Sequence, residues 1–215
     1  MTPIHALFSE VETVLARHQP ELKSTLSAAG ITIEGAFVCI SDDGPFDHFE
    51  VKLEITSSFP LKEPKLWEVA GRIPHTRQRH VYSDGSCCLG LWEAWLLKTS
   101  VADFEQYLLG PVSSYFVSQF MYETTGEWPF GEQGHSLTDV AATYGEALDL
   151  PAGTDLVAYF KLLSAPLLTG NPPCPCGSGN RLRICHWSEL RQTRRRVDAS
   201  VRKKLAKRLM KIAKE

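Results

Sequence analysis

Within residues 31–39 and 49–55, apolar side chains recur at nearly every second position, and this alternation constrains the fold more than any other sequence feature. Residues 49–55 alternate apolar with polar or charged side chains, which is typical of a half-buried strand. A similar row covers residues 31–39, and the turn-forming residues 42–45 separate the two. A shorter strand is expected at 66–69. Successive strands joined by turns predict an antiparallel meander.

Helical periodicity flanks this meander on both sides. Thr2 and Pro3 are suited to begin a helix, and apolar residues then recur at helical spacing as far as Leu15. A second helical pattern covers 101–123, with an interruption near Gly110–Pro111. Further helices are expected around 136–148 and 155–165, whereas residues 71–100 follow neither period. The sequence therefore predicts an α+β fold with a long irregular segment, a feature that is usually functional.

Charge divides the chain into an acidic body and a basic tail. Residues 1–180 hold 10 Lys and Arg against 22 Asp and Glu, a balance of −12. Residues 181–215 hold 13 against 3, a balance of +10. Such an asymmetry indicates an anionic partner for the tail, or a tail that lies on its own body.

The six cysteines favour metal binding or catalysis over disulfides. The first residues contain no basic leader, and no run of 18 apolar residues occurs, so we expect a cytoplasmic protein without a membrane span. In that compartment thiols stay reduced. Cys39 falls on an apolar row and is expected to be a small buried hydrophobic residue.

The segment CPCGSGNRLRICH carries a complete set of ligands for one metal ion. Cys174, Cys176, Cys185 and His186 supply three thiolates and an imidazole, the complement of a structural zinc site with no open position for water. The segment resembles the SEC-C motif, a short zinc-binding element that ends the SecA translocation ATPase and is appended to many bacterial proteins. This resemblance covers about 20 residues and implies docking or stability.

A basic helix is expected after the zinc segment. Asp198 is suited to cap it, and apolar residues from Val201 to Ile212 recur near helical spacing among lysines and arginines. This surface suits nucleic acid phosphates or an acidic protein, although it lacks aromatics for base stacking. A helix packed on the acidic body is equally compatible with the pattern.

The irregular segment contains a candidate nucleophile. In HVYSDGSCCLGLWEAW, Asp84–Gly85 forms a tight turn before Cys87 and Cys88. In an extended segment neighbouring side chains point in opposite directions, so at most one of the two thiols would face solvent. His75 and His80 lie near in sequence and could stabilise charge there. Alternatively, both cysteines belong to the core.

Residues 59–95 resemble the core of ubiquitin-conjugating enzymes. FPLKEP resembles their Tyr-Pro-x-x-x-Pro element, and VYSDGS, followed by one residue, Cys and Leu, resembles the run that ends at their catalytic cysteine. The resemblance, which spans roughly residues 3–165, implies a UBC-like fold and a nucleophile at Cys88, with Trp92 or Trp95 at the position of the family's downstream tryptophan. The family's His-Pro-Asn is replaced by Gln78, Arg79 and His80, so His80 stands at the Asn position, where a donor would face an oxyanion.

The resemblance implies three domains and a transferase. The expected ranges are 1–168 for the UBC-like domain, 169–190 for the zinc module and 191–215 for the basic helical tail. Bacterial relatives belong to anti-phage operons and conjugate either a ubiquitin-like protein or a CD-NTase-type cyclic-oligonucleotide synthase, as in CBASS systems, some with an activating enzyme. The loop GEWPFGEQGH at residues 126–135 resembles one in these bacterial relatives, and its His135 could approach the site or be a surface residue. A UBC-fold adaptor without catalysis, and a cysteine hydrolase that pairs Cys88 with His75 or His80, are the alternatives.

Overall fold

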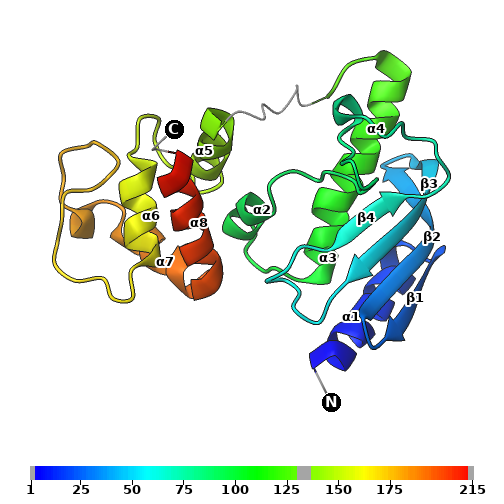
Figure 1. Ribbon diagram of the computed structural model, residues 1–215, viewed down its shortest axis with the longest axis horizontal. Coiled ribbons are helices and arrows are strands. Elements are labelled where there is room, and N and C mark those ends of the chain that lie inside the picture. The colour runs from blue at the N-terminus through cyan, green and yellow to red at the C-terminus, as the bar shows by residue number, and fades with distance from the viewer. Residues whose placement is uncertain (1–2, 130–136, 213–215) are drawn as a thin grey trace. The chain divides into compact units, whose positions relative to one another are not determined.

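The computed structural model describes residues 3–129 and 137–212, and its contacts divide the chain into two compact units (Figure 1). The first unit comprises Met1–Gly90 and Ala102–Glu132. The second comprises Leu91–Val101 and Gln133–Glu215. The division differs from the expected ranges, because three helices from within 1–168 belong to the unit that also holds the zinc segment and the tail.

The first unit is built on an antiparallel meander, as the alternation predicts. Its strands are β1 (Leu22–Ser27), β2 (Gly30–Ser41), β3 (Gly44–Ile55) and β4 (Lys65–Glu68), which pair in sequence order within the described residues. The registers of β2 and β3 place Ile33 opposite Leu53, and both side chains are buried. Strand β1 was not predicted, because an edge strand with only two apolar residues carries a weak pattern.

Helices cover this sheet and fill its core. They are α1 (Pro3–His18), the one-turn η1 (Arg77–Arg79), α3 (Phe104–Tyr107), the π-helical turn η2 (Leu108–Val112) and α4 (Ser113–Thr125). Phe116 of α4 is fully buried, with ring centroids 5.1 Å from Phe37 and 4.8 Å from Phe49. The expected interruption near Gly110–Pro111 is confirmed as η2, because proline cannot donate the hydrogen bond of a regular helix.

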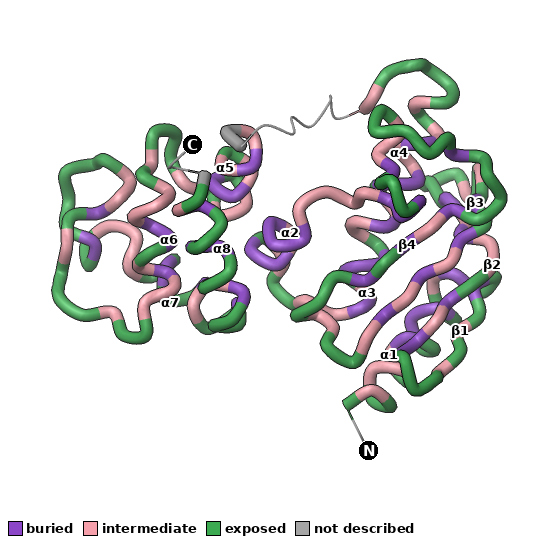
Figure 2. Tube along the Cα trace, in the orientation of Figure 1, coloured by how far each residue is buried: buried purple, intermediate pink, exposed green. Residues whose placement is uncertain are grey.

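The second unit is helical. It contains α2 (Trp92–Lys98), α5 (Leu137–Glu146), α6 (Leu156–Ser164), the one-turn η3 (Leu182–Ile184), α7 (Trp187–Arg196) and α8 (Ala199–Ile212). Helix α8 packs against α6 and α5, and its Leu205 and Leu209 are buried. Figure 2 shows buried residues along most of α2, which lies within the segment expected to be irregular. Asp198 accepts the Ser200 N–H at 2.7 Å, so the predicted cap of α8 is confirmed.

The described residues together form an α+β chain. Cys39 is 1 % exposed, as its place on an apolar row predicts. Among the described residues, no helix is both long enough and apolar enough to cross a membrane. Thr2, the predicted cap of the first helix, lies outside the described residues.

Candidate functional site

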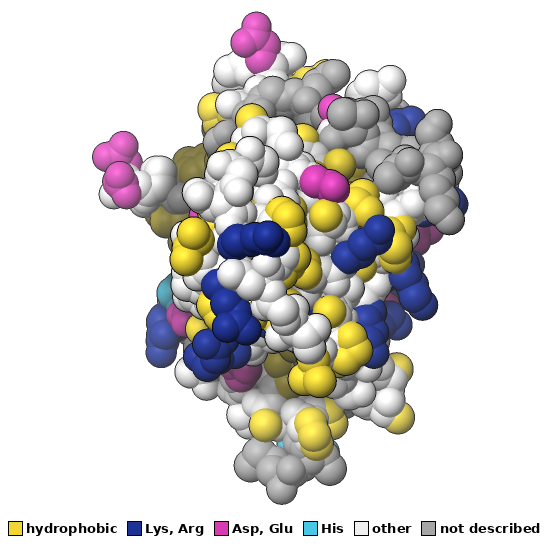
Figure 3. All heavy atoms as spheres, turned by 90° about the vertical axis from the view of Figure 1, so that its left-hand side faces the viewer, with side chains coloured by type: hydrophobic (Ala, Val, Ile, Leu, Met, Phe, Trp, Pro, Cys, Tyr) yellow, Lys and Arg dark blue, Asp and Glu magenta, His cyan; other side chains and the backbone are white. Residues whose placement is uncertain are grey.

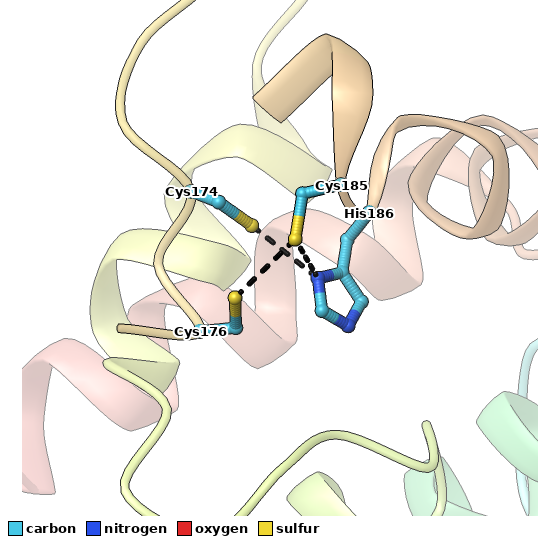
Figure 4. A group of neighbouring side chains, drawn as sticks. All are labelled: Cys174, Cys176, Cys185 and His186. Carbon is cyan, nitrogen blue, oxygen red and sulfur yellow. Dashed lines mark hydrogen bonds between the residues drawn. The ribbon is translucent and has the colours of Figure 1, made fainter. Parts of the chain in front are cut away.

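The four expected metal ligands converge in the second unit. Cys174, Cys176, Cys185 and His186 point toward one another in Figure 4, and their ligand atoms all lie within 4.8 Å of one another. Nδ1 of His186 lies 3.3 Å from the Cys174 sulfur and 3.1 Å from that of Cys185. The sulfurs of Cys176 and Cys185 are 3.5 Å apart. The structure therefore contains a candidate metal centre where the sequence predicts one.

Local backbone hydrogen bonds bring these ligands together. The Cys174 N–H donates to the carbonyl of Asn180 at 2.8 Å, which folds the intervening residues into a tight loop. Gly177 and Gly179 both have φ of +76°, a left-handed conformation that favours glycine. Cys185 follows η3, and His186 directly precedes α7. Thirteen consecutive residues thus form the whole cluster.

This donor set fits a zinc ion. With Zn–S bonds of about 2.3 Å, tetrahedral sulfurs lie about 3.8 Å apart, close to the observed spacing. The Ser178 hydroxyl lies 3.2 Å from the Cys176 sulfur, and hydrogen bonds from Ser178 lower the pKa of this thiol to about 6. A lower pKa favours the thiolate, which is the form that binds metal. Four protein ligands fill a tetrahedral shell, which fits a structural ion.

The metal cluster is continuous with the core of its unit. Cys174 is 6 % exposed, and Leu182 of η3 and Leu190 of α7 are fully buried. The Asp155 N–H, at the start of α6, donates to the carbonyl of Pro175 at 2.9 Å. Assembly of the cluster is therefore coupled to the packing of α6 and α7.

The two adjacent cysteines belong to the first unit, and the structure separates their environments. The Cys87 N–H donates to the carbonyl of Leu66 in β4 at 2.7 Å, and Cys87 also pairs with Val81 across the loop. Cys87 is 5 % exposed, and burial raises the pKa of its thiol to about 11. A buried neutral thiol is a poor nucleophile. Cys88 is only partly buried, which is the arrangement expected when neighbours in an extended segment face opposite ways.

His80 is linked to Cys88 through the main chain. Its carbonyl accepts the Cys88 N–H at 2.7 Å, and its backbone is left-handed, with φ of +51°. The His80 ring lies edge-on to Trp128, with centroids 4.8 Å apart. The ring of His75 lies elsewhere in the loop, close to Gly85, where an added Cβ would lie 3.1 Å from the imidazole. His135 lies outside the described residues.

The two tryptophans that follow the cysteine segment lie in a helix of the other unit. Trp92 and Trp95 form a tilted pair in α2, with centroids 4.6 Å apart. This helix belongs to the second unit, so the chain passes from Cys88 into the other unit within three residues. Sequence reasoning also missed Gln119, a fully buried polar residue of α4. A glutamine on the apolar face of an amphipathic helix was the available signal.

Many basic side chains of the C-terminal region bind within their own unit. Arg194 donates to the carbonyls of Leu162 and Leu163 at the end of α6. Arg196 donates to carbonyls at the end of α2, namely those of Leu97, Lys98 and Thr99. Cations at a helix C-terminus satisfy unpaired carbonyls and oppose the helix dipole. These contacts support the expectation that the tail lies on the protein itself.

Two further cations of α8 pair with α2. Lys204 and Arg208 lie 2.6 Å and 3.4 Å from the carboxylate of Glu93, a buried residue of α2. The face drawn in Figure 3 shows Lys and Arg side chains interspersed with hydrophobic ones. This mixed distribution differs from the continuous basic patch of a typical nucleic acid interface.

The chain matches no family model, no curated protein and no solved structure.

Proposed function

We propose that this chain is a transferase like the ubiquitin-conjugating enzymes, with Cys88 as its nucleophile. The observation that carries the proposal is the contrast between the two cysteines. Cys87 is buried with a raised thiol pKa, whereas Cys88 is partly exposed at the end of a loop whose sequence resembles the family's active-site run. An exposed thiol in a hydrogen-bonded loop is available to an acyl donor.

The reaction has two acyl transfers. The Cys88 thiolate attacks the carbonyl carbon of a C-terminal glycyl thioester on an activating enzyme, and that enzyme's thiolate leaves. An amine then attacks the carbonyl carbon of the Cys88 thioester, the C–S bond breaks, and the amine nitrogen loses a proton. The protein supplies positioning and a place for the oxyanion. Neither step involves a change in oxidation state.

The resemblance defines the expected partners. The acyl donor is the C-terminus of a ubiquitin-like protein or of a CD-NTase-type cyclic-oligonucleotide synthase, and the setting is bacterial anti-phage defence. The C-terminal cluster holds a zinc ion through Cys174, Cys176, Cys185 and His186 in this proposal. When bound, the ion supplies folding energy to the second unit and no chemistry to the transfer.

The test is adduct formation. The purified chain is incubated with ATP and the products of its neighbouring genes, and then analysed on non-reducing gels. A thiol-sensitive adduct that is lost in Cys88→Ala and kept in the matched control Cys87→Ala supports the proposal. Loss in Cys87→Ala alone overturns the assignment of the nucleophile. The absence of an adduct with every product overturns the transferase.

One observation favours an adaptor as the second candidate. The ring of His80, the residue at the position of the family's asparagine, packs edge-on against Trp128. The family's asparagine, which would face an oxyanion, is thus absent, and the ring that replaces it is in contact with Trp128. An adaptor would bind its partner without adduct formation, and the same incubation followed by size-exclusion chromatography would detect that complex.

A further inference from the structure

The amide of Gln119 in α4 is a buried polar group near the cysteine loop. Gln119 is fully buried, and both ends of its amide are hydrogen-bonded to Arg79. Its Nε2 donates to the Arg79 carbonyl at 2.7 Å, and its Oε1 accepts from Arg79 Nε at 2.9 Å. We call these two bonds the Gln119 bridge. They tie α4 to a loop 40 residues earlier in the sequence.

Arg79 is itself restrained on its outer side. Its Nη2 donates to Glu123 at 2.9 Å, and the side chain of Arg79 is only 12 % exposed. Glu123 also accepts from Arg72, which pairs with Asp47 of β3. The Gln119 bridge is therefore the buried end of a polar network that joins α4, the sheet and the loop. A network of this kind fixes a single arrangement when all its members are satisfied.

The bridge ends one residue before the group that contacts Cys88. Arg79 precedes His80, which has a left-handed backbone, and the His80 carbonyl accepts the Cys88 N–H. The hydroxyl of Tyr115, one helical turn before Gln119 in α4, lies 3.4 Å from the carbonyls of both Arg79 and His80. A left-handed non-glycine residue costs free energy and persists only where its surroundings hold it.

We propose that Gln119 is a positioning residue for Cys88: its amide fixes the Arg79–His80 main chain, which in turn holds the Cys88 backbone through the His80 carbonyl. This inference deepens the proposed transferase and rests on it for the catalytic consequence. Its structural consequence, the restraint of Cys88 within the loop, is measurable without any partner.

The test compares two buried amides of the same unit. Gln119→Met keeps the length of the side chain but removes its donor and acceptor. The matched control is Gln19→Met, because Gln19 is also buried and its amide donates to the Val38 carbonyl and accepts the Val38 N–H. Val38 precedes Cys39, a buried cysteine of β2, so each variant has its own thiol reporter. Iodoacetamide labelling of the full chain, resolved by peptide mass spectrometry, measures both thiols.

We expect each glutamine variant to raise the labelling rate of its own reporter thiol and to leave that of the other thiol unchanged. Gln119→Met should label Cys88 about three-fold faster and leave Cys39 unchanged, since local opening exposes only the segment that was held. Gln19→Met should label Cys39 faster and leave Cys88 unchanged. In the adduct assay, Gln119→Met should slow transfer about ten-fold or more, because small displacements of a nucleophile cost orders of magnitude in rate. Tyr115→Phe, which removes only a hydroxyl, should change the Cys88 labelling rate and the transfer rate in the same directions, but by less. This variant replaces Gln119→Met in the test if Gln119→Met does not fold.

Other results would contradict either the positioning role of Gln119 or the proposed transferase. Equal changes of Cys88 labelling in the two glutamine variants, or none in Gln119→Met and Tyr115→Phe, would show that Gln119 is merely structural. A wild-type chain that forms no adduct but shows the reciprocal labelling would reject the transferase and keep the restraint of Cys88 by Gln119.

Discussion

The two cysteine-bearing sites of this chain are constructed in opposite ways. The candidate metal cluster takes all four of its side chains from residues 174–186, and a hydrogen bond from the Cys174 N–H to the Asn180 carbonyl closes its loop within that segment. The Cys88 loop is held from outside, by Leu66 of β4 and by Gln119 and Tyr115 of α4. A site made of local contacts can be recognised in a sequence. A site made of distant contacts becomes visible only in the folded chain.

Removal of the metal ligands should have the largest effect and tests whether the local site holds its unit together. Because binding of a structural zinc ion contributes about 10–16 kcal/mol in small zinc peptides, Cys174→Ser or chelation should unfold the second unit. The sheet of the first unit should persist. Metal content by mass spectrometry and the melting transitions of the full chain measure this. A single transition in which the whole chain melts together would contradict the independence of the two units.

Truncation of the first unit's core is the reciprocal test. Phe116→Ala should cost about 3–5 kcal/mol, since a fully buried aromatic ring between two others leaves a cavity. Zinc affinity should be unchanged in this variant, because the ligands lie in the other unit. Denaturant unfolding and a competitive zinc titration check both statements. A parallel loss of zinc would show that the units fold as one.

The arginine that caps α2 should matter less. Arg196→Ala removes charged hydrogen bonds to the carbonyls that end α2, which should cost about 1 kcal/mol because Arg196 is exposed. Arg195→Ala, a change of an exposed neighbour, is the matched control. Denaturant midpoints of the two variants measure the difference, and equal midpoints would mean that the cap contributes nothing.

An effect that develops only above about pH 9 concerns the buried member of the cysteine pair. The pKa of Cys87 is raised from 9.0 to about 11, so the unfolded chain loses this proton first as pH rises. The free energy of unfolding should therefore fall from about pH 9 toward 11. In Cys87→Ala the free energy of unfolding should decline less steeply with pH. The control Cys88→Ala should leave the slope unchanged. Unfolding curves at successive pH values provide the slopes, and equal slopes in the two variants would contradict a buried Cys87.

The same contrast explains what the sequence could predict. Period-two alternation predicted β2 and β3, because burial of one sheet face leaves a direct trace in the sequence, and a short apolar stretch after Pro64 predicted β4. It missed β1, where only Leu22 and Leu26 are apolar, and α2, which lies in a segment rich in irregular motifs. The four candidate metal ligands, whose ligand atoms lie within 4.8 Å of one another, were predicted as a set. The support of Cys88 was not, because no spacing rule connects Gln119 with a loop 40 residues away.

Two arginines of α7 that bind the carbonyl ends of α2 and α6 affect how strongly binding of a polyanion should depend on salt. The guanidinium groups of Arg194 and Arg196 are already bonded to helix carbonyls, and Lys204 and Arg208 face Glu93. Binding of heparin or DNA would then displace fewer counterions than the 13 basic residues after position 180 suggest. A plot of the logarithm of affinity against the logarithm of salt concentration should accordingly have a shallow slope.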